Sequence, residues 1–334
     1  MQRNVGAGDP ALGIGNAPYL PGRQLQRAAR GAYIADRVAQ GVFFVCAVFL
    51  IAVIVGIFVF VGLNAFRVFS EGATVQNFFF GTTWDPIGAT NINNTPNYGA
   101  GGLIVGSIVI TFFSVLIATP LSFGMALFFT EVSPRWLARA LQPLLEIFTG
   151  MPSVVIGFLG LVVIVPFLQR LLAPVDNNLQ TAGFGWGAAI LVLVIMIVPT
   201  IVSISIDTLR AVPQSVREAS LALGSTRWQM MRSAVIPAAT TGLATAVVLG
   251  MARAIGETLA VSLVLGGDQL PRNLLTPLIF FQPNVNITAI VAVQFGDAFG
   301  AARDAYWTLA FILLVLSFVF VSVSRYLASR SVYK

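Results

Sequence analysis

The sequence predicts an all-α membrane protein with six transmembrane helices. Of the 334 residues, 57% are hydrophobic and only 10% are charged, which is too apolar for an ordinary soluble domain. Six apolar runs are long enough to cross the hydrocarbon core of a bilayer, and polar loops separate them. These runs are residues 41–63, 103–129, 144–168, 188–206, 238–266 and 307–323.

The segments at the two ends are predicted to lie outside the membrane. Residues 1–40 are rich in Gly, Ala, Pro and Arg, so we expect 1–28 to be disordered and 30–40 to form a short interfacial lead-in. The first apolar run is longer than the core of a signal peptide and lacks an obvious cleavage site, so we expect it to be an uncleaved span. The membrane domain is then 41–330, and 331–334 is a short tail.

The distribution of positive charge supports the number of spans. If both termini are on the same side, the loops on the other side hold only a few of the 19 Lys and Arg residues. These few are Arg67, Arg170, Arg272 and Arg303. Because cytoplasmic loops carry the excess of Lys and Arg, we expect both termini to be cytoplasmic.

Several function classes are excluded by what the sequence lacks. There is no histidine, which rules out His-based catalysis and His-ligated metal sites. A single cysteine, Cys46, cannot form an intramolecular disulfide. No Gly-rich loop ends in Gly-Lys-Ser or Gly-Lys-Thr, the motif that cradles nucleotide phosphates. We therefore expect no catalytic residue, no bound metal or cofactor, and no nucleic-acid binding.

The basic loop 207–237 is predicted to contain two short helices joined at Gly224, a residue that fits a left-handed helix stop. The first helix follows Pro213, which suits the first helical turn. The second helix begins at a capping box, indicated by the spacing of Thr226 and Gln229, and ends near Pro237. We call this pair of helices the bracket.

Three apolar side chains of the bracket have nothing in the loop to bury them: Leu221, Leu223 and Trp228. One interpretation is that they plug a groove on a partner protein. The other is that the bracket lies on lipid headgroups, anchored by its cations. The anchors would be Arg217, Arg227 and Arg232. The residues alone leave both interpretations open.

The fifth apolar run contains Arg253 and Glu257, whose spacing places them on one face of a continuous helix. A charge near the middle of a membrane costs roughly 2.5–3.5 kcal/mol on insertion scales, so it needs a partner or a polar cavity. We favour a transport role in which Arg253 attracts an oxyanion. When no anion is present, Glu257 would pair with Arg253 and hold the arginine side chain in place. The alternative is a purely structural ion pair.

The third run, 144–168, is interrupted by Pro152, which removes one helical hydrogen bond. The carbonyl freed in this way could line a polar path together with Ser153, or the proline could simply kink the helix for packing, which we favour. Glu146 is expected to have a structural role and to meet Arg139 or another cation of the inner loops.

The bracket resembles the EAA loop of ABC importer permeases. The residues that carry the resemblance are Glu218-Ala219-Ser220, then Gly224, then Pro237 at the usual spacing, although Ser220 replaces the second alanine. The resemblance implies that the bracket is a coupling helix that docks into an ATPase subunit. Its coupling residues would be Glu218, Ala219, Ser220, Leu221, Gly224 and Trp228.

Other motifs resemble the permease subunits of phosphate ABC importers of the Pst type, over roughly residues 30–330. The run Arg253-Ala-Ile-Gly-Glu-Thr258 resembles the motif of their fifth span. The further matches are residues 120–124, Thr130-Glu131, Pro134, Glu146, Met151-Pro152-Ser153 and Gly157. Asp36-Arg37 and Trp84-Asp85-Pro86 are closer to the C-type than to the A-type subunit.

This resemblance implies a MetI-like type I importer permease fold in a bacterial inner membrane, and a transport subunit rather than an enzyme. ATP and magnesium would be bound by two copies of a partner ATPase. A periplasmic phosphate-binding protein would dock near Trp84 and residues 274–281, and an A-type permease would complete a heterodimer. The substrate path would include Arg253, Glu257, Thr258 and Ser153.

Three alternatives are kept. The first is a permease for another oxyanion such as sulfate or molybdate, against which the motif of the fifth span argues. The second is an ion-coupled carrier or channel that works alone. The third is a membrane scaffold that transports nothing.

Overall fold

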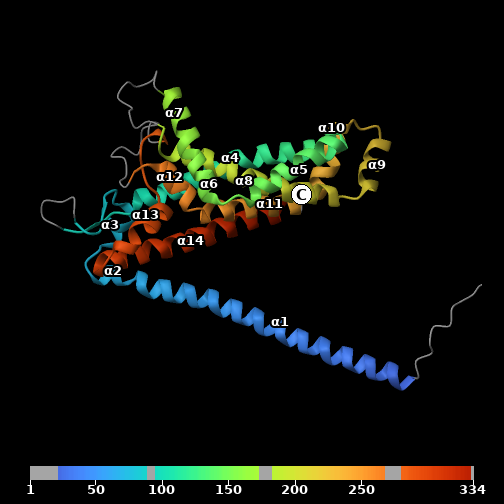
Figure 1. Ribbon diagram of the computed structural model, residues 1–334, viewed down its shortest axis with the longest axis horizontal. Helices are drawn as coiled ribbons and strands as arrows, with labels where there is room; N and C mark the ends of the chain where they lie inside the picture. Colours follow the sequence, from blue (N-terminus) through green and yellow to red (C-terminus); the bar gives the residue numbers. More distant parts are fainter. Residues whose placement is uncertain (1–21, 89–94, 173–182, 268–279, 332–334) are drawn as a thin grey trace, which may run out of the picture. The chain divides into compact units, whose positions relative to one another are not determined.

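The computed structural model describes residues 22–88, 95–172, 183–267 and 280–331. The chain divides into two compact units, residues 1–57 and 58–334. In the first unit the described part belongs to helix α1 (Gly22–Ala65), which continues into the second unit (Figure 1). The prediction of disorder is wrong for 22–28, where Arg, Gln, Leu and Ala favour a helix, and 1–21 lie outside the described residues.

Six helices in the described part of the chain are long and apolar enough to cross a membrane, which confirms the predicted number. They cover Asp36–Ser70, Gly101–Val132, Ser153–Leu172, Trp186–Ala211, Arg227–Gly256 and Gly300–Tyr326. The apolar helix between the fifth and sixth spans, Ile287–Asp297, is too short to cross.

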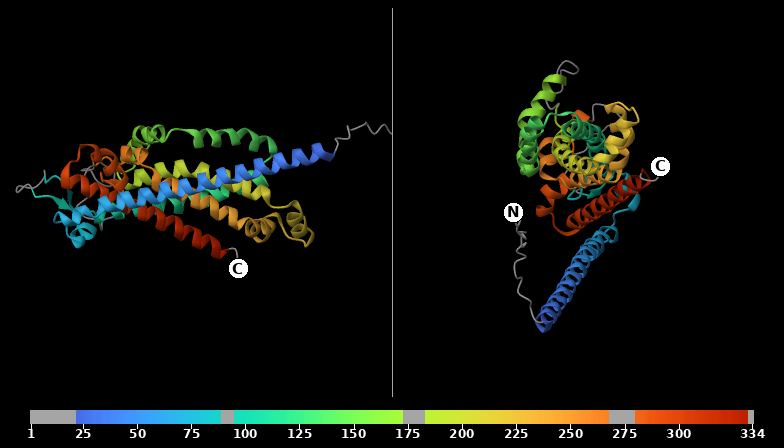
Figure 2. Two further views of the ribbon diagram at one scale, coloured as in Figure 1. Left: turned by 90° about the horizontal axis from the view of Figure 1, so that it is seen from below. Right: turned by 90° about the vertical axis from the view of Figure 1, so that its right-hand side faces the viewer.

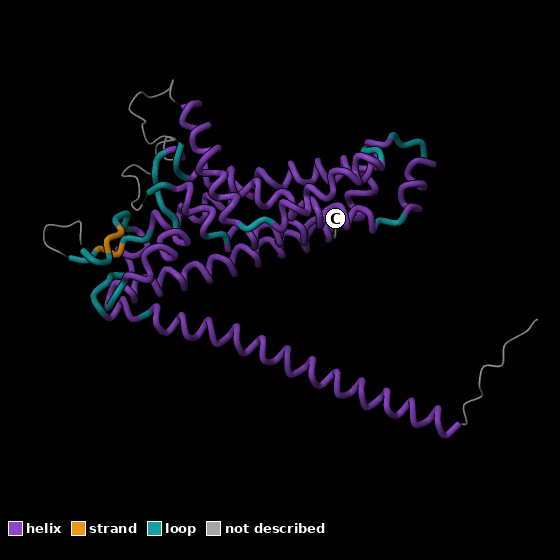
Figure 3. The backbone as a smooth tube through the Cα atoms, viewed as in Figure 1, coloured by secondary structure: helices purple, strands orange, loops and turns teal. Residues whose placement is uncertain are grey.

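Short elements gather at one end of the second unit. They are α2 (Arg67–Ser70), α3 (Val75–Phe80), and the antiparallel strands β1 (Trp84–Asp85) and β2 (Asn97–Tyr98), at the left in Figure 3. The ring of Trp84 packs edge-on against Phe78 and Tyr306. Aromatic contacts therefore fasten this end of the unit to the start of the last span.

The remaining elements are helical. In chain order they are α4 (Gly101–Leu127), the π-helical turn η1 (Phe128–Val132), α5 (Arg135–Gly150), α6 (Ser153–Leu159), the π-helical turn η2 (Gly160–Ile164), α7 (Val165–Leu172), α8 (Trp186–Ala211), α9 (Gln214–Ala222), α10 (Arg227–Met230), the π-helical turn η3 (Met231–Val235), α11 (Ile236–Gly256), α12 (Leu259–Leu265), α13 (Ile287–Gln294), the 3₁₀ turn η5 (Phe295–Asp297) and α14 (Gly300–Ser331).

Helix α8 is the centre of the second unit. It packs against α4 and α11, and α11 packs in turn against α14; these helices run lengthwise beside one another in Figure 2. In the most apolar 18-residue stretch of α8, 72% of the residues are buried, whereas in the corresponding stretch of α14 only 11% are buried. A helix that is apolar on all sides is expected in such a position. Ser114 and Ser122 of α4 also donate to carbonyls of α8, both at 3.4 Å.

The predicted third span begins too early. Helix α5 ends at Gly150, and Met151 and Pro152 are extended, with ψ of 137° and 134°, before α6 starts at Ser153. A residue that precedes proline is pushed away from the helical conformation, so the break falls here rather than as a kink. Glu146 therefore belongs to α5, where it accepts from Gln142 at 3.4 Å and does not pair with Arg139.

The predicted fifth span differs at both ends. The helix does not stop near Pro237, because η3 joins α10 to α11 without interruption and Pro237 is the second residue of α11. At the other end α11 stops at Gly256, and a separate helix, α12, begins at Leu259. Residues 227–256 are therefore one rod, and 257–258 are a break.

The short helices α6 and α12 pack in close contact. A Cβ placed on Gly157 would lie 2.5 Å from the Cα of Ala260. We therefore expect Gly157→Ala to force the two backbones apart and to destabilise the protein by about 1–3 kcal/mol. The midpoint of thermal unfolding in detergent should fall. Gly124→Ala, in a helical position with no atom within 4 Å of the added Cβ, is the control and should change little; an equal effect of both variants would contradict the close packing.

Candidate functional site

The break between α11 and α12 is the centre of the candidate path. Glu257 is extended, with φ −77° and ψ 126°, and Thr258 has φ −120° and ψ −61°. The Glu257 carboxylate accepts from the N–H of Ala260 at 3.4 Å, at the start of α12. A carboxylate is favourable at this position because the first N–H groups of a helix have no partner within the helix.

Arg253 lies in the last turn of α11 and reaches towards α8. Its Nη1 donates to the hydroxyl oxygen of Thr200 at 2.9 Å. The predicted pair of Arg253 and Glu257 on one helical face is wrong, because the helix ends before Glu257 and the two side chains form no ion pair. Each has a neutral partner instead.

Ser153 and Thr258 lie at corresponding positions in two neighbouring helices. Helices α6 and α12 are in contact at Gly157 and Ala260, and one turn later at Gly160 and Val264, so they run in the same direction. Ser153 begins α6 one turn before this contact, and Thr258 immediately precedes α12. Both short helices therefore start beside the break.

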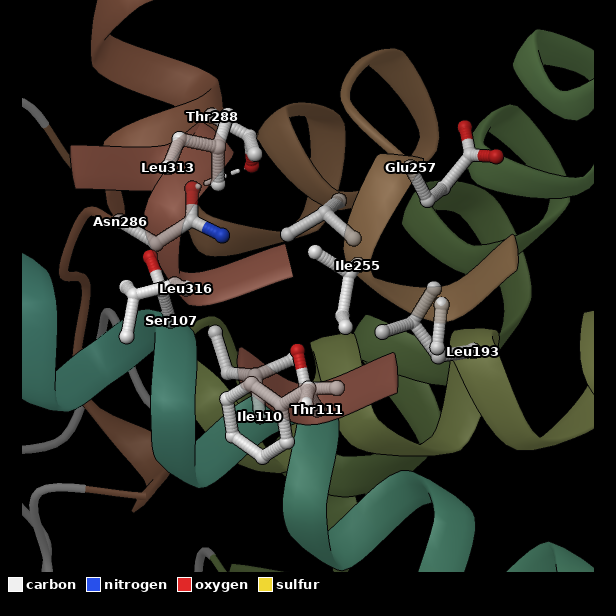
Figure 4. A pocket seen from close by; sticks show the side chains of 13 residues that line it. Ser107, Ile110, Thr111, Leu193, Ile255, Glu257, Asn286, Thr288, Leu313 and Leu316 are labelled. Carbon is white, nitrogen blue, oxygen red and sulfur yellow. Dashed lines mark hydrogen bonds between the residues drawn. The ribbon is translucent and has the colours of Figure 1, made fainter. Parts of the chain in front are cut away.

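A small pocket adjoins the break on the side of α13 (Figure 4). Its polar residues come from α4 and from the start of α13: Ser107, Thr111, Asn286 and Thr288, all buried. The Ser107 hydroxyl accepts from the N–H of Ile287 at 3.1 Å. The side-chain oxygen of Asn286 accepts from the Thr288 hydroxyl at 3.1 Å and from the N–H of Ala289 at 2.9 Å.

Glu257 also lines this pocket, but in Figure 4 its carboxylate is directed away from Asn286 and Thr288. The pocket thus combines neutral hydroxyl and amide groups with a carboxylate at its edge, inside an otherwise apolar bundle. Such groups can solvate water or a small polar solute. The sequence reasoning missed this pocket, although two hydroxyl residues within the apolar run 103–129 were a usable signal.

The bracket forms as predicted at its centre. Gly224 has φ +82°, a left-handed conformation that favours glycine. Both hydrogen bonds of the Thr226 and Gln229 capping box are present, at 2.9 Å and 3.3 Å. Ser225 donates to the carbonyl of Ser220 at 2.7 Å, and their hydroxyls are 2.8 Å apart. The turn between the helices is therefore locked.

The outward face of the bracket is apolar. Leu223 is 90% exposed, Trp228 61% and Leu221 44%, which confirms the prediction that they protrude. Glu218 and Ala219 are exposed beside them. All six residues expected to couple to an ATPase lie on α9, α10 or the turn that joins them.

Arg217 does not behave as a lipid anchor. Its side chain is only 14% exposed, and it donates to Glu131, which is 9% exposed and lies in η1. The groove around this pair is lined by Arg210, Gln214, Leu221, Arg227, Met230 and Met231, among others. Sequence reasoning missed the pair, because 86 residues separate its members.

Six apolar helices long enough to cross a membrane, with a partly buried cation, a partly buried carboxylate and a small polar pocket among them, define a multi-pass membrane protein. Residues 118–333 match the family described as the binding-protein-dependent transport system inner membrane component. The chain therefore belongs to this family, whose members are multi-pass inner-membrane components of transport systems.

Curated relatives are similar over most of their length. The chain is 40% identical over 288 residues to the probable ABC transporter permease protein YqgH of Bacillus subtilis, covering 85% of this chain and 88% of that one. It is 34% identical over 303 residues to the phosphate transport system permease protein PstC of Pasteurella multocida, covering 86% and 89%.

Solved structures show the fold. An inward-facing MetNI methionine ABC transporter aligns with a TM-score of 0.53 at 18% identity, over 69% of this chain and 94% of that one. A bacterial alginate ABC transporter in complex with a periplasmic protein aligns with a TM-score of 0.52 at 16% identity, over 70% and 79%. These alignments confirm the predicted MetI-like importer permease fold.

Proposed function

We propose that this chain is the permease subunit of an ATP-driven importer of inorganic phosphate. The observation that carries the proposal is the state of Arg253, a partly buried cation of the fifth membrane span whose side-chain partner is the neutral hydroxyl of Thr200. No carboxylate of the described residues forms an ion pair with it. A guanidinium without a counter-ion in an apolar bundle favours an oxyanion, and its geometry matches phosphate. The similarity to relatives named as phosphate permeases supports the choice of phosphate.

The path proposed for the anion runs past the break between α11 and α12. Arg253 attracts the anion, and the hydroxyls of Ser153 and Thr258 offer hydrogen bonds beside the two helix starts. Glu257 repels an anion that moves too far along the path. Its carboxylate therefore sets where the anion stops, and no resident metal or cofactor is needed for this step.

The driving force comes from elsewhere. A permease of this family works with an ABC ATPase and a substrate-binding protein. We assign ATP and magnesium to two copies of the ATPase, which dock on the bracket through the exposed Leu223 and Trp228. An A-type permease forms a heterodimer with this chain in the lipid bilayer. The phosphate-binding protein docks at the opposite end, near Trp84; of the expected docking segment 274–281, the structure describes only residues 280 and 281.

The bracket transmits movement because it is continuous with the rod 227–256. At 1.5 Å per residue the rod is about 45 Å long, enough to pass from the bracket to Arg253 across most of a bilayer. Closure of the ATPases therefore moves the segment that carries the cation. In this arrangement the bracket and both chain termini are cytoplasmic.

The role of Arg253 predicts that Arg253→Gln reduces ATP-dependent phosphate uptake into proteoliposomes at least about ten-fold, because the neutral amide no longer attracts the anion. Assembly with the partner subunits should be unchanged, since the substitution keeps a hydrogen-bond donor near Thr200. Arg325→Gln, at an exposed position near the end of α14, is the control and should transport normally. Normal uptake by the Arg253 variant would refute the proposed path.

The docking role of the bracket predicts that Leu223→Asp strongly reduces the amount of ATPase that co-purifies with the permease, because a buried carboxylate at the interface would lack a partner. Phe299→Asp, which is 79% exposed at the opposite end of the unit, should leave co-purification unchanged. Equal recovery of ATPase with both variants would favour a bracket that only contacts lipid.

The orientation can be tested directly. A reporter that is active only in the cytoplasm should be active when fused after Lys334, and a cysteine introduced at exposed Phe299 should react with a membrane-impermeant reagent added outside. The reverse pattern would invert the proposed topology.

A further inference from the structure

The guanidinium of Arg217 joins three separate parts of the permease. Its Nε and Nη2 donate to one carboxylate oxygen of Glu131, at 3.2 Å and 2.9 Å. Nη2 also donates to the carbonyl of Leu209 at 2.8 Å, and Nη1 donates to the carbonyl of Val212. Glu131 belongs to the turn after α4, and the two carbonyls belong to the end of α8.

These contacts satisfy the carboxylate of Glu131 and the carbonyl of Val212, and they add a second donor to the carbonyl of Leu209, which also accepts from the N–H of Val212 at 3.3 Å. The last carbonyls of a helix have no partner within it, and a cation is favourable at that end. Glu131 is nearly buried, so its charge needs a partner that the solvent cannot supply. Among the described residues the pair of Arg217 and Glu131 is the only ion pair.

Helix α9 is only partly packed. It contacts η3, and Val216 packs against the core, but none of its residues is fully buried, and its exposed face carries the residues expected to meet the ATPase. The bracket itself is internally locked through Ser220, Ser225 and the capping box. Because the bracket is internally rigid and α9 is only partly packed, the bracket would move independently of the other helices unless a side chain joined α9 to them.

We propose that the pair of Arg217 and Glu131, with the carbonyls of Leu209 and Val212, is a strut that passes movement of the ATPase-bound bracket to α4 and α8. The inference rests on the proposed function, in which the bracket is the docking site for the ATPase. Arg217 is then a positioning residue, since it acts on the path through these two helices. Without the strut, α9 moves while α4 and α8 stay behind.

The strut predicts a loss of coupling rather than a loss of hydrolysis. In the reconstituted complex with its ATPase, Arg217→Met should lower the phosphate imported per ATP hydrolysed by about ten-fold or more, because the nearly buried carboxylate of Glu131 loses its charged partner and the ends of α4 and α8 lose their link to α9. Arg217→Lys should be intermediate, since an ammonium lacks the planar fork that reaches three acceptors at once. Arg210→Met, which removes an exposed cation of the same groove that lies on α8 and outside the bracket, is the matched control and should leave the ratio unchanged.

A second measurement, of distances between spin labels, does not depend on phosphate transport. Spin labels at exposed Val132 and at exposed Ser215 of α9, in a Cys46→Ser background, report the distance between η1 and the bracket. The distance distribution should be narrow in the intact complex and in Arg210→Met, and broad in Arg217→Met. If Arg217→Met does not assemble, Glu131→Gln replaces it and should broaden the distribution in the same way.

An unchanged distance distribution in the variant that assembles, together with an unchanged coupling ratio, overturns the strut. If the intact complex imports no phosphate at all, the proposed function fails instead, and the spin-label distances alone decide the strut.

Discussion

A helix can be interrupted inside a hydrocarbon layer only where other parts of the protein satisfy the backbone groups that it frees. Two interruptions in this permease obey that constraint together. Helix α6 begins after Pro152 and helix α12 begins after Thr258, and the two helices pack at Gly157 and Ala260. Glu257 supplies the acceptor for one freed N–H. The polar features of the interior therefore collect where the spans are broken.

This arrangement separates the two functions of the fifth span. On one side of the break, the rod 227–256 joins the bracket to Arg253 without interruption. On the other side, α12 packs with α6 and adjoins the pocket around Asn286. Movement of the rod can change the surroundings of Arg253 while α6 and α12 keep their mutual packing. In a single unbroken helix, movement of the segment that carries Arg253 would also move the segment that packs against α6.

The local features of this molecule could be predicted from the sequence. The number of spans follows from apolar length, and the capping box at Thr226 and the stop at Gly224 follow from residue chemistry within a few positions. The break after α11 was harder to predict from the sequence. Gly256, Glu257 and Thr258 are all compatible with a helix, so tertiary packing decides where α11 ends. If a continuous helix is assumed across such a break, residues four positions apart are wrongly expected to share a face, as Arg253 and Glu257 were. The partners Thr200 and Glu131 lie 53 and 86 residues away from Arg253 and Arg217, beyond what a single sequence reveals.

The central claim is that the bracket and the segment carrying Arg253 move as one piece. Spin labels at exposed Ser215 on the bracket and at exposed Leu249 on α11 test it most directly, measured in the complex without nucleotide, with ATP bound and after hydrolysis. The account predicts one distance that stays the same in all three states. A distance that changes between states would show that the bracket bends away from α11, and would contradict the claim that docking force reaches the anion path through the rod.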